Sequence, residues 1–102
     1  MSGHNRLELL PISFIGRSEV KGVEFTQLKT SDKAYIYQRI EDEGIIYYEV
    51  FVRKQVNKFD FETNTQLEDM KEIYPKSNNF GSWAWCCKDI NKAMIKFKEL
   101  NE

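Results

Sequence analysis

Two neighbouring stretches of the chain alternate in side-chain character with the period of a β-strand. They are residues 34–40 and 45–54, and residues 41–44 join them with a glycine at the end. Alternating stretches that flank a short glycine-containing loop predict a β-hairpin, in which successive side chains point to opposite faces. One face of this hairpin is the apolar one, formed by Ala34, Ile36, Ile40, Ile46, Tyr48, Val50 and Val52.

The C-terminal part of the chain predicts a strand that leads into a helix. Trp83 and Trp85 alternate with Ala84, so both indoles would share one face of a strand. Asp89 stands where the N-cap of the helix is expected. Apolar residues then follow at helical spacing, namely Ile90, Ala93, Met94, Phe97 and Leu100. We expect this helix to pack on the apolar face of the hairpin, with both tryptophans sealing it onto the sheet.

The N-terminal part contains two weaker strand patterns. Residues 7–15 are rich in apolar side chains but include Pro11, which predicts an edge strand or an irregular lead-in because proline has no ladder donor. Residues 23–28 alternate as a strand does, and residues 29–32 have the composition of a turn.

Residues 55–79 form a polar insertion between the hairpin and the closing strand. Residues 57–61 either extend a strand or form a loop. Thr65 and Glu68 have the spacing of a capping box, which predicts a short amphipathic helix that ends before Pro75.

This order of elements predicts an α+β fold. We expect a single domain over residues 7–102, preceded by a flexible tail at residues 1–6. The domain would hold a four- or five-stranded antiparallel meander, with the C-terminal helix on one face and the short helix in the 55–79 insertion.

Composition narrows the chemistry of the chain. Its 102 residues suffice for one domain, and a net charge of −1 gives no overall basic field for nucleic acid. No stretch has the length and apolarity of a membrane span or a signal peptide, so the expected location is cytoplasmic, with no membrane contact. Adjacent Cys86 and Cys87 and the single His4 provide neither the usual zinc spacing nor a nucleophile–base pair. We therefore expect no enzyme activity, no catalytic residue, no metal and no cofactor.

The face of the hairpin opposite the apolar one is the candidate binding surface. Aromatic rings interleaved with cations on an open sheet can stack on unpaired bases, and the same residue types are common in protein interfaces. The alternative is that the rings only cover the second face of the sheet or pack under the insertion. The candidate binding residues are Tyr35, Tyr37, Arg39, Tyr47, Phe51, Arg53, Lys54 and Lys58.

Two function classes remain open on this evidence. The first is a small accessory protein that binds a protein partner through this face or through the 55–79 insertion. The second is a nucleic-acid-binding module that uses the aromatic and arginine face. The sequence does not indicate an oligomeric state.

Parts of the chain resemble known families. The layout of residues 35–40 and 47–53, Phe80-Gly81, and a helix with Ala93 and Phe97 resembles the WGR nucleic-acid-binding module, although Val52-Arg53-Lys54 stands near the place of its Trp-Gly-Arg. The segment from Phe80 to Trp85 followed by a helix is similar to small uncharacterised proteins of phages and mobile elements. The second resemblance implies an accessory factor that binds a host or defence protein in the host cytoplasm.

Overall fold

The computed structural model describes residues 7–17 and 20–102. The chain forms two compact units. The first, called here the helix unit, comprises residues 11–53 and 75–102. The second, called here the hairpin unit, comprises residues 54–74 together with the N-terminal segment up to Leu10. The predicted tail at residues 1–6 lies outside the described residues.

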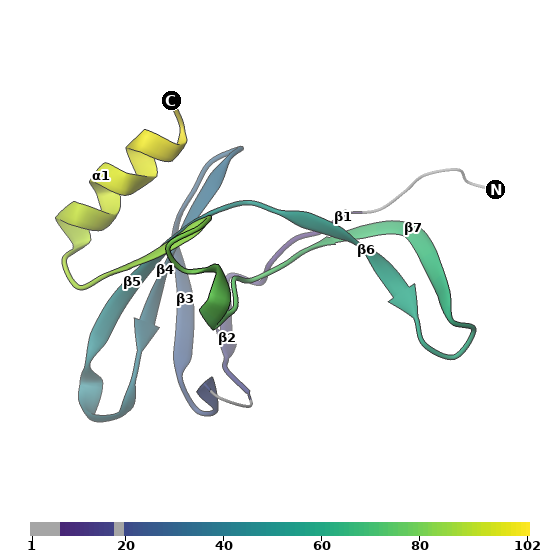
Figure 1. Cartoon of the computed structure of the whole chain (residues 1–102). Helices are drawn as coiled ribbons and strands as arrows, with labels where there is room; N and C mark the ends of the chain where they lie inside the picture. The colour runs from purple at the N-terminus through teal and green to yellow at the C-terminus, as the bar shows by residue number, and fades with distance from the viewer. Residues whose placement is uncertain (1–6, 18–19) are drawn as a thin grey trace. The chain divides into compact units, whose positions relative to one another are not determined.

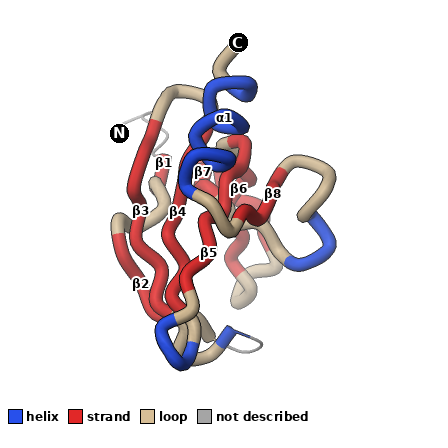
Figure 2. The backbone as a smooth tube through the Cα atoms, turned by 90° about the vertical axis from the view of Figure 1, so that its left-hand side faces the viewer, coloured by secondary structure: helices blue, strands red, loops and turns tan. Residues whose placement is uncertain are grey.

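The helix unit is built on a five-stranded antiparallel sheet with the order β2-β3-β4-β5-β8 (Figure 2). The predicted α+β class and the five-stranded meander are confirmed, with β8 added beside β5. Pro11 lies just before the edge strand β2, a position where its missing N–H removes no ladder hydrogen bond. The bounds of the strands are β2 Ser13–Ile15, β3 Glu24–Thr30, β4 Ala34–Ile40, β5 Ile46–Val52 and β8 Ala84–Cys87.

The central hairpin of this sheet has the strands that the sequence alternation predicted. Strands β4 and β5 pair in register from Ala34 opposite Val52 to Ile40 opposite Ile46. The connecting loop contains a short 3₁₀ turn, η2, at Asp42–Gly44, and Gly44 has a φ of 77°. This left-handed conformation carries no penalty for a residue without a Cβ, which explains the glycine at the end of the loop.

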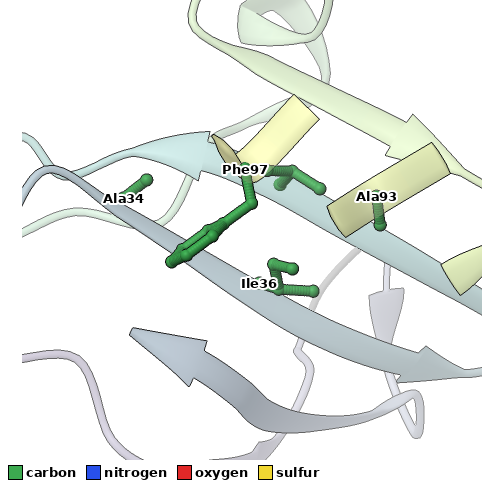
Figure 3. Close-up of a cluster of buried hydrophobic side chains, with 5 residues drawn as sticks. Ala34, Ile36, Ala93 and Phe97 are labelled. Carbon is green, nitrogen blue, oxygen red and sulfur yellow. The ribbon is translucent and has the colours of Figure 1, made fainter. Parts of the chain in front are cut away.

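Helix α1, Ile90–Leu100, packs across the apolar face of the sheet. The Asp89 side chain accepts a hydrogen bond from the backbone N–H of Asn91, so the predicted N-cap is confirmed. The core between helix and sheet consists of Ala34, Ile36, Val50, Ala93 and Phe97 (Figure 3). Of the predicted helical stripe, Ile90 and Met94 remain more than one third exposed, so the buried face is narrower than the spacing suggested.

The two tryptophans do not share a face. Trp85 lies on strand β8 opposite Val50 of β5, and its ring is 4.5 Å from the Lys96 ammonium of α1. Trp83 precedes the strand, and its ring meets Phe51 on the other side of the sheet at 6.4 Å. Gly81, with a φ of 92°, and hydrogen bonds from Ser82 and Trp83 to Asn79 hold residues 79–83 in a turn. Strand alternation therefore does not extend back to Trp83.

The hairpin unit is a three-stranded sheet with the order β1-β7-β6 (Figure 1). Strands β6, Gln55–Asp60, and β7, Thr65–Glu72, form an antiparallel hairpin, and β1, Leu7–Glu8, pairs parallel with β7. The helix predicted from the Thr65 and Glu68 spacing is wrong, because this segment is strand β7. Its pairing with β6 is irregular between Asn57 and Phe59, and this irregularity removes the strict alternation that would have indicated a strand.

The 7–15 segment is divided between the two sheets rather than forming one strand. Leu7–Glu8 forms β1 and Ser13–Ile15 forms β2, with Pro11 between them. The turn predicted at residues 29–32 is shorter than expected, because β3 continues to Thr30. A further 3₁₀ turn, η3, occupies Ser77–Asn79 before the closing strand.

The position of Phe97 gives a first prediction. Phe97→Ala is expected to lower the free energy of unfolding by about 3–5 kcal/mol, because it removes a ring from the core under α1. Ile95→Ala, at a helix position that is 62% exposed, is the control and should change it by less than about 0.5 kcal/mol. Urea denaturation of both variants measures the difference. Equal losses would contradict this placement of the helix.

Candidate functional site

Three of the rings expected on an open face are buried. Tyr35, Tyr37 and Phe51 expose 2%, 0% and 0% of their surface. Their centroids lie 5.6–5.8 Å apart, and the cluster continues to Phe14, which is 5.9 Å from Tyr37. The expectation that these rings face solvent is wrong, because the second face of the sheet is itself covered. Their π faces are therefore already engaged inside the protein and cannot serve as a stacking platform in this conformation.

The buried aromatic cluster forms a second core, on the face of the sheet opposite α1. The hydroxyl of Tyr37 is hydrogen-bonded within this cluster. It donates a hydrogen bond to the Pro11 carbonyl at 2.6 Å and accepts one from the Gln27 amide at 3.0 Å. Phe14 and Phe25 stack in parallel 4.7 Å apart beside this group. The aromatic side of the sheet thus has both the packing and the hydrogen bonding of a protein interior.

Arg39 belongs to an ion-pair network rather than to a free cationic surface. Its guanidinium contacts Glu49 at 3.1 Å and Glu41 at 2.7 Å, and lies 5.8 Å from the ring centroid of Phe25. The Glu49 side chain is only 2% exposed, whereas that of Glu41 is 31% exposed. Burial by itself lowers the pKa of Arg39, but the hydrogen bond and charge of Glu49, followed by those of Glu41, raise this pKa overall. The two carboxylates neutralise Arg39, so it is a poor anchor for a phosphate.

Arg53 and Tyr47 are half-buried at the borders of the same face. Arg53 donates to the Ser31 carbonyl at 2.9 Å, and its guanidinium lies 4.7 Å from the Tyr35 ring centroid. The Tyr47 ring has the Lys88 ammonium 5.8 Å from its centroid. Both residues keep some exposed surface, but they flank the buried rings instead of forming one open surface with them.

The remaining two predicted residues, Lys54 and Lys58, belong to the hairpin unit. Lys58 forms an ion pair with Glu8 at 2.9 Å, and this hydrogen bond and charge lower the pKa of Glu8. The contribution of this pair is therefore present above the unfolded pKa of Glu8 and is lost as the pH falls through the folded pKa. The eight predicted residues thus divide between two units, with Lys54 and Lys58 in the hairpin unit and the other six in the helix unit.

Cys86 and Cys87 are neighbours at the end of strand β8. Cys86 and Cys87 are both free of disulfides, in agreement with their opposite directions on β8. Over residues 7–17 and 20–102, no three His, Cys, Asp or Glu side chains gather into a metal-holding group. In that same part of the chain, no helix has the length and apolarity needed to cross a membrane. His4 lies outside the described residues.

The surface that sequence reasoning missed lies on the β6–β7 hairpin. Phe61 is 86% exposed and Phe59 is 42% exposed, and their rings meet edge to face at 4.9 Å. The turn that carries Phe61 is ordered by Asp60, whose carboxylate accepts from the N–H groups of Glu62 and Thr63. Two sequence signals indicated a turn here. Asp60 is a turn-forming residue, and Asn64 is a residue type that tolerates a positive φ, which is 55° in the structure. The helical spacing from Thr65 onward obscured them.

Other apolar side chains of the hairpin unit are also exposed. None of the hydrophobic residues that the structure buries belongs to this unit within the described chain, where Glu72 is the buried residue and accepts from the Leu10 N–H. A sheet of this size does not form a core by itself. The exposed apolar residues of the unit are Leu7, Leu9, Val56, Phe59, Phe61 and Leu67.

Comparison with known proteins gave no match to a family model, a curated protein or a solved structure.

The Arg39 network gives a second prediction. Glu49→Ala is expected to destabilise the protein by about 2 kcal/mol, because it leaves a partly buried guanidinium without its inner carboxylate. The expected loss is below that of a fully buried pair because Arg39 still reaches solvent. The control Glu41→Ala removes the exposed partner and should cost less than about 1 kcal/mol. Thermal melts at neutral pH compare the two, and an equal loss would contradict a structural role specific to Glu49.

The thiols give a third prediction. Burial, followed by the charge of Glu49, raises the pKa of Cys86, and burial raises that of Cys87 against the opposing charges of Lys96 and Lys92. Because the thiolate is the nucleophile, both cysteines should react with iodoacetamide more slowly in the native chain than in urea at the same mildly alkaline pH. The gap should narrow as the pH rises further. Faster labelling of either cysteine in the native chain would contradict these shifts.

Proposed function

We propose that this chain is a small binding protein that acts on a protein partner through the tip of the hairpin unit. The observation that carries the proposal is the Phe59–Phe61 pair, in which one ring is almost fully exposed and is supported edge to face by the other. Clustered exposed aromatic side chains are a common feature of protein-interaction sites. The proposed role is that of an accessory factor rather than an enzyme.

The energy available at this tip supports such a role. Moving one phenylalanine ring from water into an apolar pocket yields about 1.5–3 kcal/mol. The Asp60 turn already holds the hairpin tip in one conformation, so less ordering entropy is lost on binding. A partner with an apolar pocket that accepts Phe61 and contacts the edge of Phe59 fits this chemistry. Such a pair can act as the central anchor of an interface.

The burial of the aromatic and arginine face argues against nucleic acid as the ligand at that face. Three lysines remain available for phosphate contacts, Lys92 and Lys96 on α1 and Lys88 just before its N-cap. Lys96 is paired with Glu99 at 3.3 Å, and Asp89 adds a further negative charge, which weakens this group of lysines. Binding there would depend steeply on salt, whereas an apolar protein interface would not.

A photocrosslinking experiment tests the proposal. The chain carries para-benzoylphenylalanine at position 61, and a control chain carries it at the exposed helix position 95. After irradiation in extracts of the organism that encodes the protein, position 61 should give a discrete protein adduct that position 95 does not. The adduct should survive nuclease and added salt. Identical adducts from both positions, or an adduct lost on nuclease treatment, would contradict the proposal.

Phe61→Ser supplies the matching loss-of-function prediction. It should weaken binding to the crosslinked partner at least tenfold, about 1.4 kcal/mol or more, without changing the thermal melt, because Phe61 is exposed. Ile95→Ser is the control and should retain wild-type affinity. A titration with the purified partner measures both. Wild-type affinity in Phe61→Ser would show that the tip is not the anchor.

A further inference from the structure

Over residues 7–17 and 20–102, no strand pairs with the outer edge of β6 in the hairpin unit. In the five-stranded sheet the edge strands are short: β2 has three residues and β8 has four. The Ala84 carbonyl of β8 already accepts a hydrogen bond from the Gly81 N–H at 2.7 Å. In the three-stranded sheet the edge strand β1 has two residues, but β6 has six. Among the described residues, β6 is therefore the edge best suited to accept another strand.

The direction of the backbone groups on β6 follows from one hydrogen bond. The N–H of Ile73 donates to the Lys54 carbonyl at 3.0 Å, so the backbone groups of Lys54 face β7. Backbone direction alternates along a strand, so Gln55 and Asn57 direct their N–H and C=O groups to the open edge. Between the pairs Asn57–Met70 and Phe59–Gln66 the extra residues of the irregularity lie on β7, so the alternation of β6 is unbroken and Phe59 continues this outward row.

We propose that β6 pairs antiparallel with β6 of a second copy of this chain, about a two-fold axis at Asn57. This register places Asn57 opposite its own copy and Gln55 opposite Phe59 of the second copy. All of these residues belong to the outward row, so their backbone groups meet in hydrogen-bonded pairs. The inference concerns the main-chain edge and does not rest on what the Phe61 ring binds.

Charge selects this register over its two neighbours. A two-fold axis perpendicular to the sheet allows only registers that pair residues of the same face. An axis at Val56 would place Lys54 opposite Lys58, and an axis at Lys58 would place that residue opposite itself. The axis at Asn57 instead places Lys54 opposite Asp60 of the second copy, and does so twice. Opposite charges across strands stabilise a pair and like charges destabilise it.

The residues beside the edge are compatible with this pairing. Gln55 and Val56 are exposed, as is Lys54, and Phe59 exposes 42% of its surface. In this register Lys58 lies opposite Val56 of the second copy and keeps its own ion pair with Glu8. The Asn57 side chain donates to the Leu67 carbonyl at 3.0 Å on its own hairpin, which leaves the backbone edge unobstructed by that amide.

Sedimentation equilibrium of the purified full chain tests the pairing with Gln55→Pro. Proline removes the outward N–H at position 55, and an edge strand tolerates this because no intramolecular ladder bond is lost. The wild type should show a concentration-dependent monomer–dimer equilibrium, and Gln55→Pro should raise its dissociation constant at least tenfold. Gln55→Ala, which keeps the N–H, should dimerise as the wild type does. A wild type that is monomeric at all concentrations, or a dimer indifferent to Gln55→Pro, would overturn the proposal.

A disulfide scan tests the register without depending on the proline variant. In a background with Cys86→Ser and Cys87→Ala, Asn57→Cys places two thiols at the axis. Backbone Cα atoms of a hydrogen-bonded antiparallel pair lie about 5.5 Å apart, within the range of a disulfide. Oxidation should give a covalent dimer for Asn57→Cys and much less for Val56→Cys. Equal yields, or a higher yield from Val56→Cys, would overturn the register.

The two proposals fail separately. Phe61→Ser should leave the dimerisation constant unchanged, since its ring is not part of the paired edge. If Gln55→Pro has no effect on self-association while Phe61→Ser abolishes partner binding, the inference fails and the proposed function stands. The reverse pattern would remove the proposed function and keep the dimer.

Discussion

Strand β4 must be covered on both faces at once, and the remainder of the helix unit is organised around this requirement. Ala34 and Ile36 point to helix α1, while Tyr35 and Tyr37 point into the aromatic cluster, and none of the four exposes more than 2%. A strand at the centre of an antiparallel sheet usually needs cover on one face only. Here the rings of the second face pack against Phe14 of β2 and Phe51 of β5, and Phe51 in turn meets Trp83.

This double coverage determines what the charged residues can do. Glu49 lies inside the sheet with Arg39 beside it, and Arg39 in turn contacts Glu49 and lies over the Phe25 ring. Buried ion pairs seldom add much net stability, but removing one partner is destabilising because it leaves the other charge uncompensated. Arg39, a predicted anchor for an external ligand, is thereby used to complete a core. The hairpin unit has the opposite character, since its apolar side chains have no comparable core.

The strands and the terminal helix could be predicted because their patterns are local. The alternation from Ala34 to Ile40 and the Asp89 cap each specify a structure within a few residues. The burial of Tyr37 could not be predicted in the same way, because its ring packs against Phe14 and Phe51, which lie on other strands. For β7 the local signal was misleading: a Thr65–Glu68 spacing typical of a helix start was overridden by pairing with β6 on one side and β1 on the other. The exposed Phe61 was visible as a residue, but its significance depended on knowing that a turn presents it.

The route of the chain through β5 and β8 has a consequence for how this protein can change over time. The chain leaves the five-stranded sheet after Val52 and returns before Ala84, and these two places are adjacent, since the Val52 N–H donates to the Trp83 carbonyl at 3.0 Å. The sheet therefore closes across the excursion, and doubling the length of such an excursion costs only about 0.6 kcal/mol in closure entropy. Residues 54–74 can accordingly diverge, lengthen or be exchanged, because the hydrophobic residues that the structure buries all belong to the helix unit. Strand β1 restrains such change, because it comes from the other end of the sequence and has to diverge together with β7.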